Sequence, residues 1–150
     1  MPAHPVPRPL DWGLAMGLGI PAFAAHRFRS DPRALVRIRT FIAQTLRQWE
    51  LTTCLDDTVL VASELASNCL LHTLQTGHEH DAGWLGLAHT RHAVLCTVTD
   101  PSPVPAAPQQ HDLLAETGRG LRIVQALSDD WGCTVPADGP GKTVWARIAR

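Results

Sequence analysis

A carboxylate, an amide and an imidazole recur at helical spacing in residues 57–72, which are otherwise mostly apolar. The polar side chains beyond Thr58 form one stripe: Ser63, Glu64, Ser67, Asn68 and His72. At about 100° per residue, Glu64, Asn68 and His72 spread over roughly 80° of one helix face. An amphipathic helix with a solvated side is the alternative. Solvated stripes usually carry long charged side chains, and this one has no lysine or arginine, so it favours a site that meets a specific ligand.

Two glycines precede a second segment with helical periodicity. Its apolar positions fall on one side of a helix: Leu121, Val124 and Leu127. Glycine lets the backbone approach a ligand closely, and the free amides of a helix start suit a phosphate. The sequence Gly118-Arg119-Gly120 is therefore a candidate anion cradle, with a plain turn as the alternative.

An apolar, β-branched segment over residues 91–100 ends in Asp100, followed by prolines. The composition predicts a buried strand that carries Asp100 to its end, and a loop over residues 101–110. A simple surface turn is the alternative, because Asp-Pro pairs commonly open turns.

The last segment is a glycine turn, Gly141-Lys142-Thr143, that leads into an alternating strand. One face of that strand would carry Val144, Ala146 and Ile148. A phosphate-binding P-loop is excluded here, because that motif requires an earlier glycine at a set spacing and a helix after the Lys-Thr pair.

Taken in order, these four signals resemble the N, D and G boxes and the final threonine motif of the Bergerat-fold (GHKL) ATPases. Within that superfamily the chain looks most like the small, single-domain anti-sigma-factor serine/threonine kinases of actinobacterial type. The resemblance covers about residues 22–149.

The resemblance implies ATP and Mg²⁺ as ligands. It makes Asn68 the Mg²⁺ ligand and Glu64 the general base that takes a proton from the attacking hydroxyl group. For His72, the alternative to a catalytic role is a structural role or contact with a partner.

The same resemblance implies that Asp100 accepts a hydrogen bond from the adenine amino group and that Thr143 supports this contact. The amides of Gly118 and Gly120 would hold the phosphates, with Arg119 as an additional charge. Many relatives carry a glycine two residues after the adenine-binding acid, where this chain has Ser102. The difference predicts modest nucleotide affinity.

Two functions follow from the resemblance. The first is a serine/threonine kinase that phosphorylates an anti-anti-sigma (STAS) partner and sequesters a sigma factor. The second is an ATP-binding interaction module with weak or no catalysis. A histidine-kinase catalytic domain is disfavoured, because no segment could serve as a long dimerisation helix with a phospho-accepting histidine. A homodimer is the oligomeric state that the resemblance implies.

Composition is consistent with a cytoplasmic regulatory protein. The net charge of −1 over 150 residues gives no electrostatic case for nucleic acid or an acidic membrane. No stretch approaches membrane-spanning length, and the start lacks a signal-peptide pattern. The cysteines, without any Cys-x-x-Cys pair, are predicted to be reduced and mostly buried: Cys54, Cys69, Cys96 and Cys133.

The periodicities predict one domain over residues 22–150 behind a flexible, proline-rich leader over residues 1–21. The expected elements are a strand at 23–29, a helix from Ser30-Asp31-Pro32 to about Glu50, a helix at 57–72, strands at 83–90 and 91–100, a helix after Gly120, and strands at 131–135 and 143–149. This order predicts a two-layer α/β (α+β) sandwich, with helices on one face of a mixed, mainly antiparallel sheet.

A second possible site is a histidine cluster that could bind zinc or nickel: His72, His78, His80 and Asp81. A solvated loop is the favoured interpretation, because no cysteine or second spaced histidine pair completes a closed site.

Overall fold

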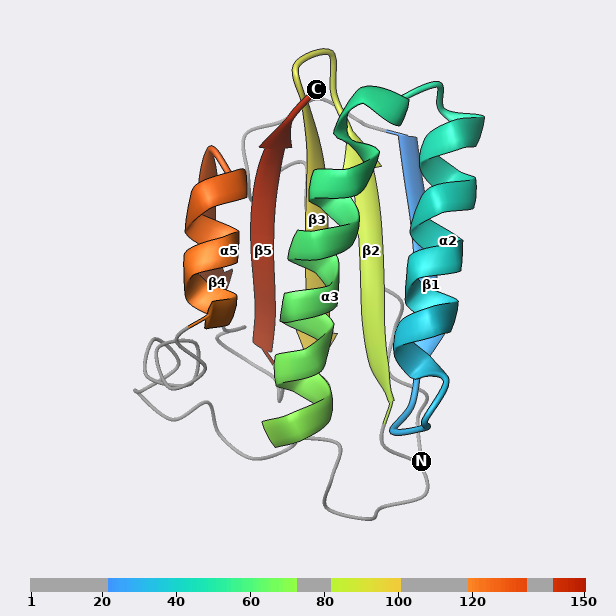
Figure 1. The fold of residues 1–150 in the computed structure, drawn as a ribbon, viewed down its shortest axis with the longest axis vertical. Helices are drawn as coiled ribbons and strands as arrows, with labels where there is room; N and C mark the ends of the chain where they lie inside the picture. Colours follow the sequence, from blue (N-terminus) through green and yellow to red (C-terminus); the bar gives the residue numbers. More distant parts are fainter. Residues whose placement is uncertain (1–21, 73–81, 101–118, 135–141) are drawn as a thin grey trace.

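The fold is a five-stranded antiparallel sheet covered by helices (Figure 1). The computed structural model describes residues 22–72, 82–100, 119–134 and 142–150. The elements in chain order are β1 (Ala22–Phe28), α2 (Ala34–Gln48), the 3₁₀ turn η1 (Thr52–Cys54), α3 (Leu55–His72), β2 (Gly83–His89), β3 (Ala93–Asp100), α5 (Arg119–Leu127), β4 (Asp130–Thr134) and β5 (Lys142–Ala149). The expected leader lies outside the described residues.

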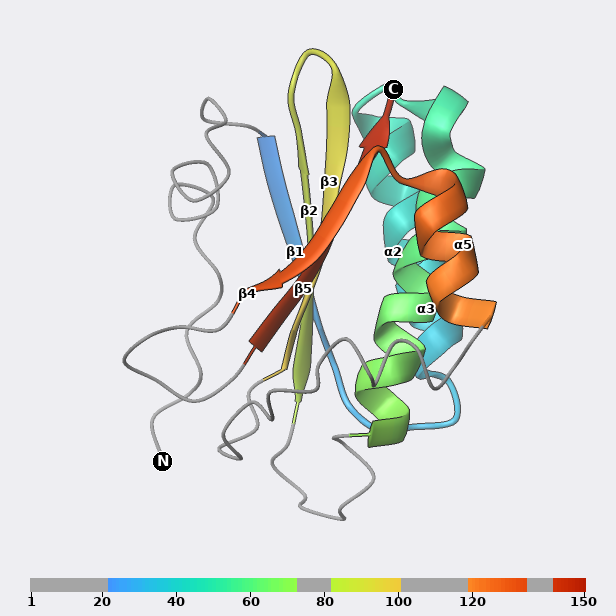
Figure 2. The ribbon, with the colours of Figure 1, turned by 90° about the vertical axis from the view of Figure 1, so that its left-hand side faces the viewer.

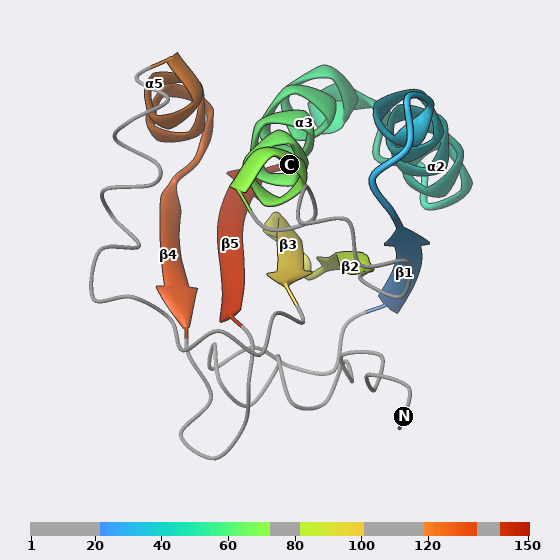
Figure 3. The same ribbon diagram turned by 90° about the horizontal axis from the view of Figure 1, so that it is seen from below.

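The strands stand in the order β1-β2-β3-β5-β4, and each described neighbouring pair is antiparallel. The helices α2, α3 and α5 lie together on one face of the sheet (Figures 2 and 3). The predicted two-layer α+β architecture is confirmed, and so are the two expected hairpin pairs, β2 with β3 and β4 with β5.

The core fills the space between the helices and the sheet. From α2 it takes Ile38, Ile42 and Leu46, all fully buried, at the i, i+4, i+8 spacing of one helix face. From β5 it takes Ala146 and Ile148, with Val144 packed at its margin. The predicted alternation of the last strand is thus correct.

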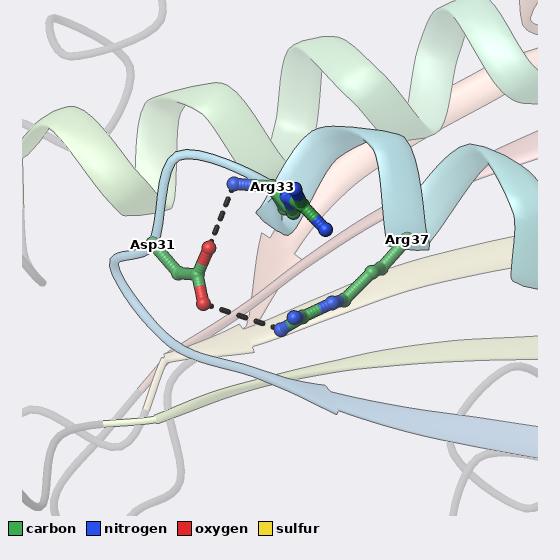
Figure 4. A network of polar contacts seen from close by, with 3 residues as sticks. All are labelled: Asp31, Arg33 and Arg37. Carbon is green, nitrogen blue, oxygen red and sulfur yellow. Dashed lines mark hydrogen bonds and ion pairs between the residues drawn. The ribbon is translucent and has the colours of Figure 1, made fainter.

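Helix α2 begins later than the sequence suggested. Asp31 Oδ1 accepts a hydrogen bond from the backbone N–H of Arg33 at 2.7 Å, and Asp31 Oδ2 lies 3.2 Å from an Arg37 guanidinium nitrogen (Figure 4). Asp31 therefore caps the chain as it turns into the helix, and regular helix starts at Ala34. The helix ends where Glu50 takes a left-handed φ of 59° and the Leu51 N–H bonds back to the Leu46 carbonyl.

All four cysteines lie among the described residues, and all are free thiols, as predicted. Burial raises the pKa of the Cys96 thiol to about 12, which keeps it protonated and unreactive. Cys133 is only half-buried. Among the described residues, no helix is long and apolar enough to cross a membrane.

Candidate functional site

Four element ends carry the predicted site residues, and they lie at one end of the molecule, the lower end in Figure 1. Helix α3 and strand β3 finish there, and helix α5 and strand β5 begin there. This arrangement follows from the topology, because β5 runs antiparallel to β3 and so starts beside the residue at which β3 stops. The site residues are far apart in sequence and are brought together by the sheet.

The polar stripe of α3 is divided between two environments. Ser63 is buried and lies against α2, where its Oγ accepts a hydrogen bond from Arg39 Nε at 3.4 Å. Ser63, predicted to belong to the polar stripe beside Glu64 and Asn68, is therefore directed at α2. A residue one position from Glu64 is rotated by about 100° and, in this helix, faces its neighbour.

Glu64 and Asn68 are half-buried, one helical turn apart. The Nδ2 atom of Asn68 is buried and has no hydrogen-bond partner in the described part of the chain. Leaving a buried donor unsatisfied costs about 1–3 kcal/mol, so such a group calls for an explanation. A ligand that engages the Asn68 amide would supply one. His72 is the last residue of α3, and its side chain is not described.

Asp100 closes β3 in a buried position, with 2% of its surface exposed. Its Oδ2 lies 3.6 Å from Nζ of Lys142, which stands directly opposite in the β3–β5 register. The ammonium group compensates a carboxylate that would otherwise be too costly to bury. One residue along, the hydroxyl groups of Thr99 and Thr143 lie 3.1 Å apart. Thr143 thus lies one register position from the Asp100–Lys142 pair, and because successive side chains of a strand leave opposite faces of the sheet, its hydroxyl group meets Thr99; its support of the adenine contact stays a prediction.

Cys69 links the helix to this strand end. Burial raises the pKa of its thiol, the negative charge of Asp100 raises it further, and Lys142 acts in the opposite direction. These electrostatic effects require both charged groups to be close to Cys69, the residue that follows Asn68. The structure therefore brings Cys69, Asp100 and Lys142 into one neighbourhood.

The glycine cradle is only partly described. Gly118 lies outside the described residues, and α5 begins at Arg119, so Gly120 is inside the first helical turn rather than before it. The prediction that both glycines precede the helix is therefore wrong for Gly120. A position in the first turn still leaves the Gly120 N–H without a partner inside the helix. The side chain of Arg119 is not described.

Other predicted features fall outside the described residues: Ser102, His78, His80 and Asp81. Among the side chains that are described, no group of three or more histidine, cysteine, aspartate or glutamate residues could hold a metal ion. The histidine-cluster interpretation stays a prediction.

Lys142 is the site residue that the sequence analysis missed. From the sequence alone, Lys142 is considered only as part of a P-loop, which is excluded. A signal was present, since Lys142 is the only lysine in the sequence and sits at the start of a strand. Its pairing with Asp100 depends on strand register, which that local pattern does not encode.

The residues present fit a nucleotide with a hard cation. The buried Nδ2 of Asn68 has no partner among the described residues and could donate to a phosphate oxygen, while the amide oxygen of Asn68 and the Glu64 carboxylate one turn away are ligand types that Mg²⁺ accepts. Asp100 supplies a buried acceptor at the strand end, suited to the amino group of a base. The donor and acceptor groups at α3 and at the β3–β5 strand ends therefore suit a polar ligand.

The sequence matches the family model of the histidine kinase-like ATPase domain over residues 28–148. A comparison with curated proteins finds no match.

Proposed function

The chain belongs to the histidine kinase-like ATPase domain family, of GHKL type, and from that premise we propose that it is a Mg²⁺-ATP-dependent serine/threonine kinase that acts on a partner protein. The family supports an ATP-binding, kinase-like domain. The choice of serine or threonine as acceptor rests on the motif likeness to small anti-sigma-factor kinases.

One observation carries the proposal: the buried Nδ2 of Asn68, which has no partner among the described residues, stands one helical turn from the half-buried carboxylate of Glu64. Asn68 and Glu64 are the two residues that phosphoryl transfer requires here. An interaction module that only held ATP would need no base at position 64.

The proposed roles follow from the likeness of the sequence motifs to those of the family. Mg²⁺-ATP would supply the transferable γ-phosphoryl group. Asn68 would hold the cation through its amide oxygen. Glu64 would accept the proton of the partner's hydroxyl group and orient that oxygen for attack.

At the strand end, Asp100 would accept a hydrogen bond from the adenine amino group, while Lys142 balances the carboxylate charge. The hydroxyl group of Thr143 would support the same contact. The amides of Gly118 and Gly120 at the α5 start would receive the phosphates, with Arg119 as an added charge.

The proposed substrate is an anti-anti-sigma (STAS) protein, and the proposed second partner is a sigma factor that the kinase sequesters in the cytoplasm. A homodimer is the proposed state. The likeness of the motif order supports these partners and this state.

The test is a calorimetric titration with ATP and MgCl₂, on the wild type and on Asn68→Ala and Asp100→Ala. Both variants should lose most of the binding. A matched control is Asp57→Ala, an exposed carboxylate in the first turn of α3, which should bind as the wild type does. Circular dichroism of each variant establishes that it is folded.

The outcomes separate the candidates. Saturable binding together with phosphorylation of a STAS partner supports the kinase. Binding without transfer to any serine-containing partner would leave the interaction module as the function. No binding by the wild type at millimolar ATP would overturn both.

A further inference from the structure

The sheet face opposite the helices, called here the outer face, is apolar in its central strands. Helices α2, α3 and α5 all lie on the other face (Figures 2 and 3). An antiparallel strand with one open face alternates apolar and polar residues, whereas a strand that is covered on both faces is apolar along its length. Strand β3 is of the second kind, since seven of its eight residues are buried. The described helices cover only one of its two faces.

The outward-pointing side chains of β2, β3 and β5 define this face. The core under the helices takes alternate residues of each strand, so the residues between them point to the outer face. On β3 these include Leu95 and Thr97, each 2% exposed. Ala88 of β2 stands opposite Leu95 and is fully buried. By the same alternation, Trp84 of β2 and Trp145 of β5 lie on the outer face.

The neighbouring strands do not account for the burial of Thr97. Its register partner on β2 is Gly86, which has no side chain. Its partner on β5 is Trp145, whose indole ring lies over Gly132 of β4, so close that a Cβ atom there would be 2.9 Å from the ring. The ring is therefore directed away from β3. The hydroxyl group of Thr97 is also buried without a hydrogen-bond partner among the described residues. These observations indicate a further layer on the outer face.

A segment of suitable pattern precedes β1 in the sequence. Residues 10–20 read Leu-Asp-Trp-Gly-Leu-Ala-Met-Gly-Leu-Gly-Ile, with a large apolar residue at each even position and a small residue or aspartate at each odd one. This period of two is typical of a strand with one apolar side. Six large apolar residues fall in this stretch, whereas the segments 73–81, 101–118 and 135–141 carry one, three and one.

We propose that residues 10–20 pack through their apolar side on the outer face, as a second layer that covers β2, β3 and β5. The segment is joined to β1, which is an edge strand of the sheet, through Pro21 alone. Extended, its eleven residues reach roughly 36 Å, and the five strands extend over only about 20 Å, so every strand is within reach. Because the segment is tethered to the sheet, it outcompetes a second copy or another protein at ordinary concentrations.

The proposal changes the domain boundary. The periodicities predicted one domain from residue 22, behind a flexible leader. With residues 10–20 on the outer face, the folded unit begins near residue 10 and has a layer on each side of the sheet. The cover also removes Trp84 and Trp145 from an exposed apolar patch that would favour association. This inference does not depend on the proposed kinase activity.

Tryptophan side chains are built-in reporters for this arrangement. Trp84 and Trp145 lie half-buried on the outer face. Trp49 packs against the core on the helix side and lies 4.7 Å from His89, measured between ring centroids. A change in the outer layer should therefore reach Trp84 and Trp145 and leave Trp49 unaffected.

The experiment is ¹⁹F NMR of the full-length protein labelled with 5-fluorotryptophan, with each signal assigned from a Trp→Phe variant. Leu14→Ser and Leu18→Ser change the apolar side of the segment, and Ala15→Ser is the matched control on its other side. Each leucine variant should shift the signal of Trp84 or Trp145 and lower the denaturant midpoint. The control should do neither, and Trp49 should stay in place throughout.

The contrary results are equally plain. Unchanged Trp84 and Trp145 signals in both leucine variants, or equal shifts with Ala15→Ser, would overturn the proposal. If Leu14→Ser unfolds the chain, which the Trp49 signal would report, Leu14→Ala makes the same comparison with a milder change. Dilution of the wild type distinguishes a second copy as the cover. Signals of Trp84 and Trp145 that change on dilution, and do so alike in Leu14→Ser, would assign the outer face to that second copy and also overturn the proposal.

Discussion

Buried polar groups are treated differently in two regions of this molecule. The first, called here the packed region, comprises α2, β1 and the first half of α3. The second, called here the site end, comprises the second half of α3, the end of β3 and the start of β5. In the packed region, the fully buried Thr58 hydroxyl donates to the Cys54 carbonyl at 2.7 Å, and burial keeps His26 neutral. At the site end, Asn68 Nδ2 has no described partner and Asp100 is buried as an ion pair.

The difference teaches how one helix serves two purposes. In the first half of α3, buried polar groups form hydrogen bonds within the protein. In the second half, the buried Asn68 Nδ2 is left for a ligand. An unsatisfied donor and a buried charge each oppose folding, so the packed region has to supply the stability that the site end does not.

The largest expected effect is at the site end. Glu64→Gln removes the proposed base while keeping the shape of the side chain, and phosphotransfer to a cognate partner should fall by about 10²–10⁴. Nucleotide affinity should stay close to that of the wild type. A radiolabelled phosphotransfer assay and calorimetry measure the two quantities.

Glu50→Gln is the matched control, because Glu50 is an exposed carboxylate at the far end of α2, in the packed region. It should leave both quantities unchanged. Normal transfer by the Glu64 variant would remove the general base from the mechanism.

On the core-facing side of α3, away from its polar stripe, substitutions should lower stability. Leu65→Ala truncates a side chain that is 2% exposed and should lower the free energy of unfolding by about 2–5 kcal/mol. Leu60→Ala, on the same helix but 50% exposed, should cost much less. Denaturant unfolding monitored by circular dichroism gives both values, and equal losses would contradict the burial pattern of α3.

The sharpest contrast is between two polar residues of α3. Thr58→Val removes a satisfied hydrogen bond and should cost about 1 kcal/mol. Asn68→Ala removes a donor that has no described partner, so in the absence of nucleotide it should cost less than Thr58→Val or even stabilise the protein. A larger loss for Asn68→Ala in the same unfolding experiment would show that its amide serves the fold.

The two regions also differ in how far the sequence predicts them. The helix at 57–72 and the strand at 143–149 were recognisable because one buried face imposes a period on the sequence. The start of α2 was misplaced, because the Asp31 cap acts from before Pro32 and delays regular helix to Ala34.

At the site end, the sequence motifs predict which residues of α3 and β3 belong to the site. They do not predict which residues surround them. The Lys142–Asp100 contact joins residues 42 positions apart through strand register. The separation of Ser63 from Glu64 depends on where α2 packs. Both depend on tertiary packing, which helical or strand periodicity alone does not predict.

The smallest expected effect tests whether the packed region avoids charge. Burial lowers the pKa of His26 below 6.5, so the unfolded chain takes up a proton before the folded one does. Above about pH 6.5 neither state is protonated there, and stability is unaffected. As the pH falls below that value, protonation favours unfolding, and the loss of stability is complete once the pH passes below the folded pKa.

His26→Gln should therefore flatten the fall in unfolding free energy on the acid side of pH 6.5, whereas His92→Gln, at an exposed turn, should leave that fall unchanged. Arg37→Gln should give an intermediate slope, since burial is the larger cause and remains. An unchanged slope in His26→Gln would mean that the packed region accommodates a charged imidazole, and the contrast with the site end would then rest on Asn68 and Asp100 alone.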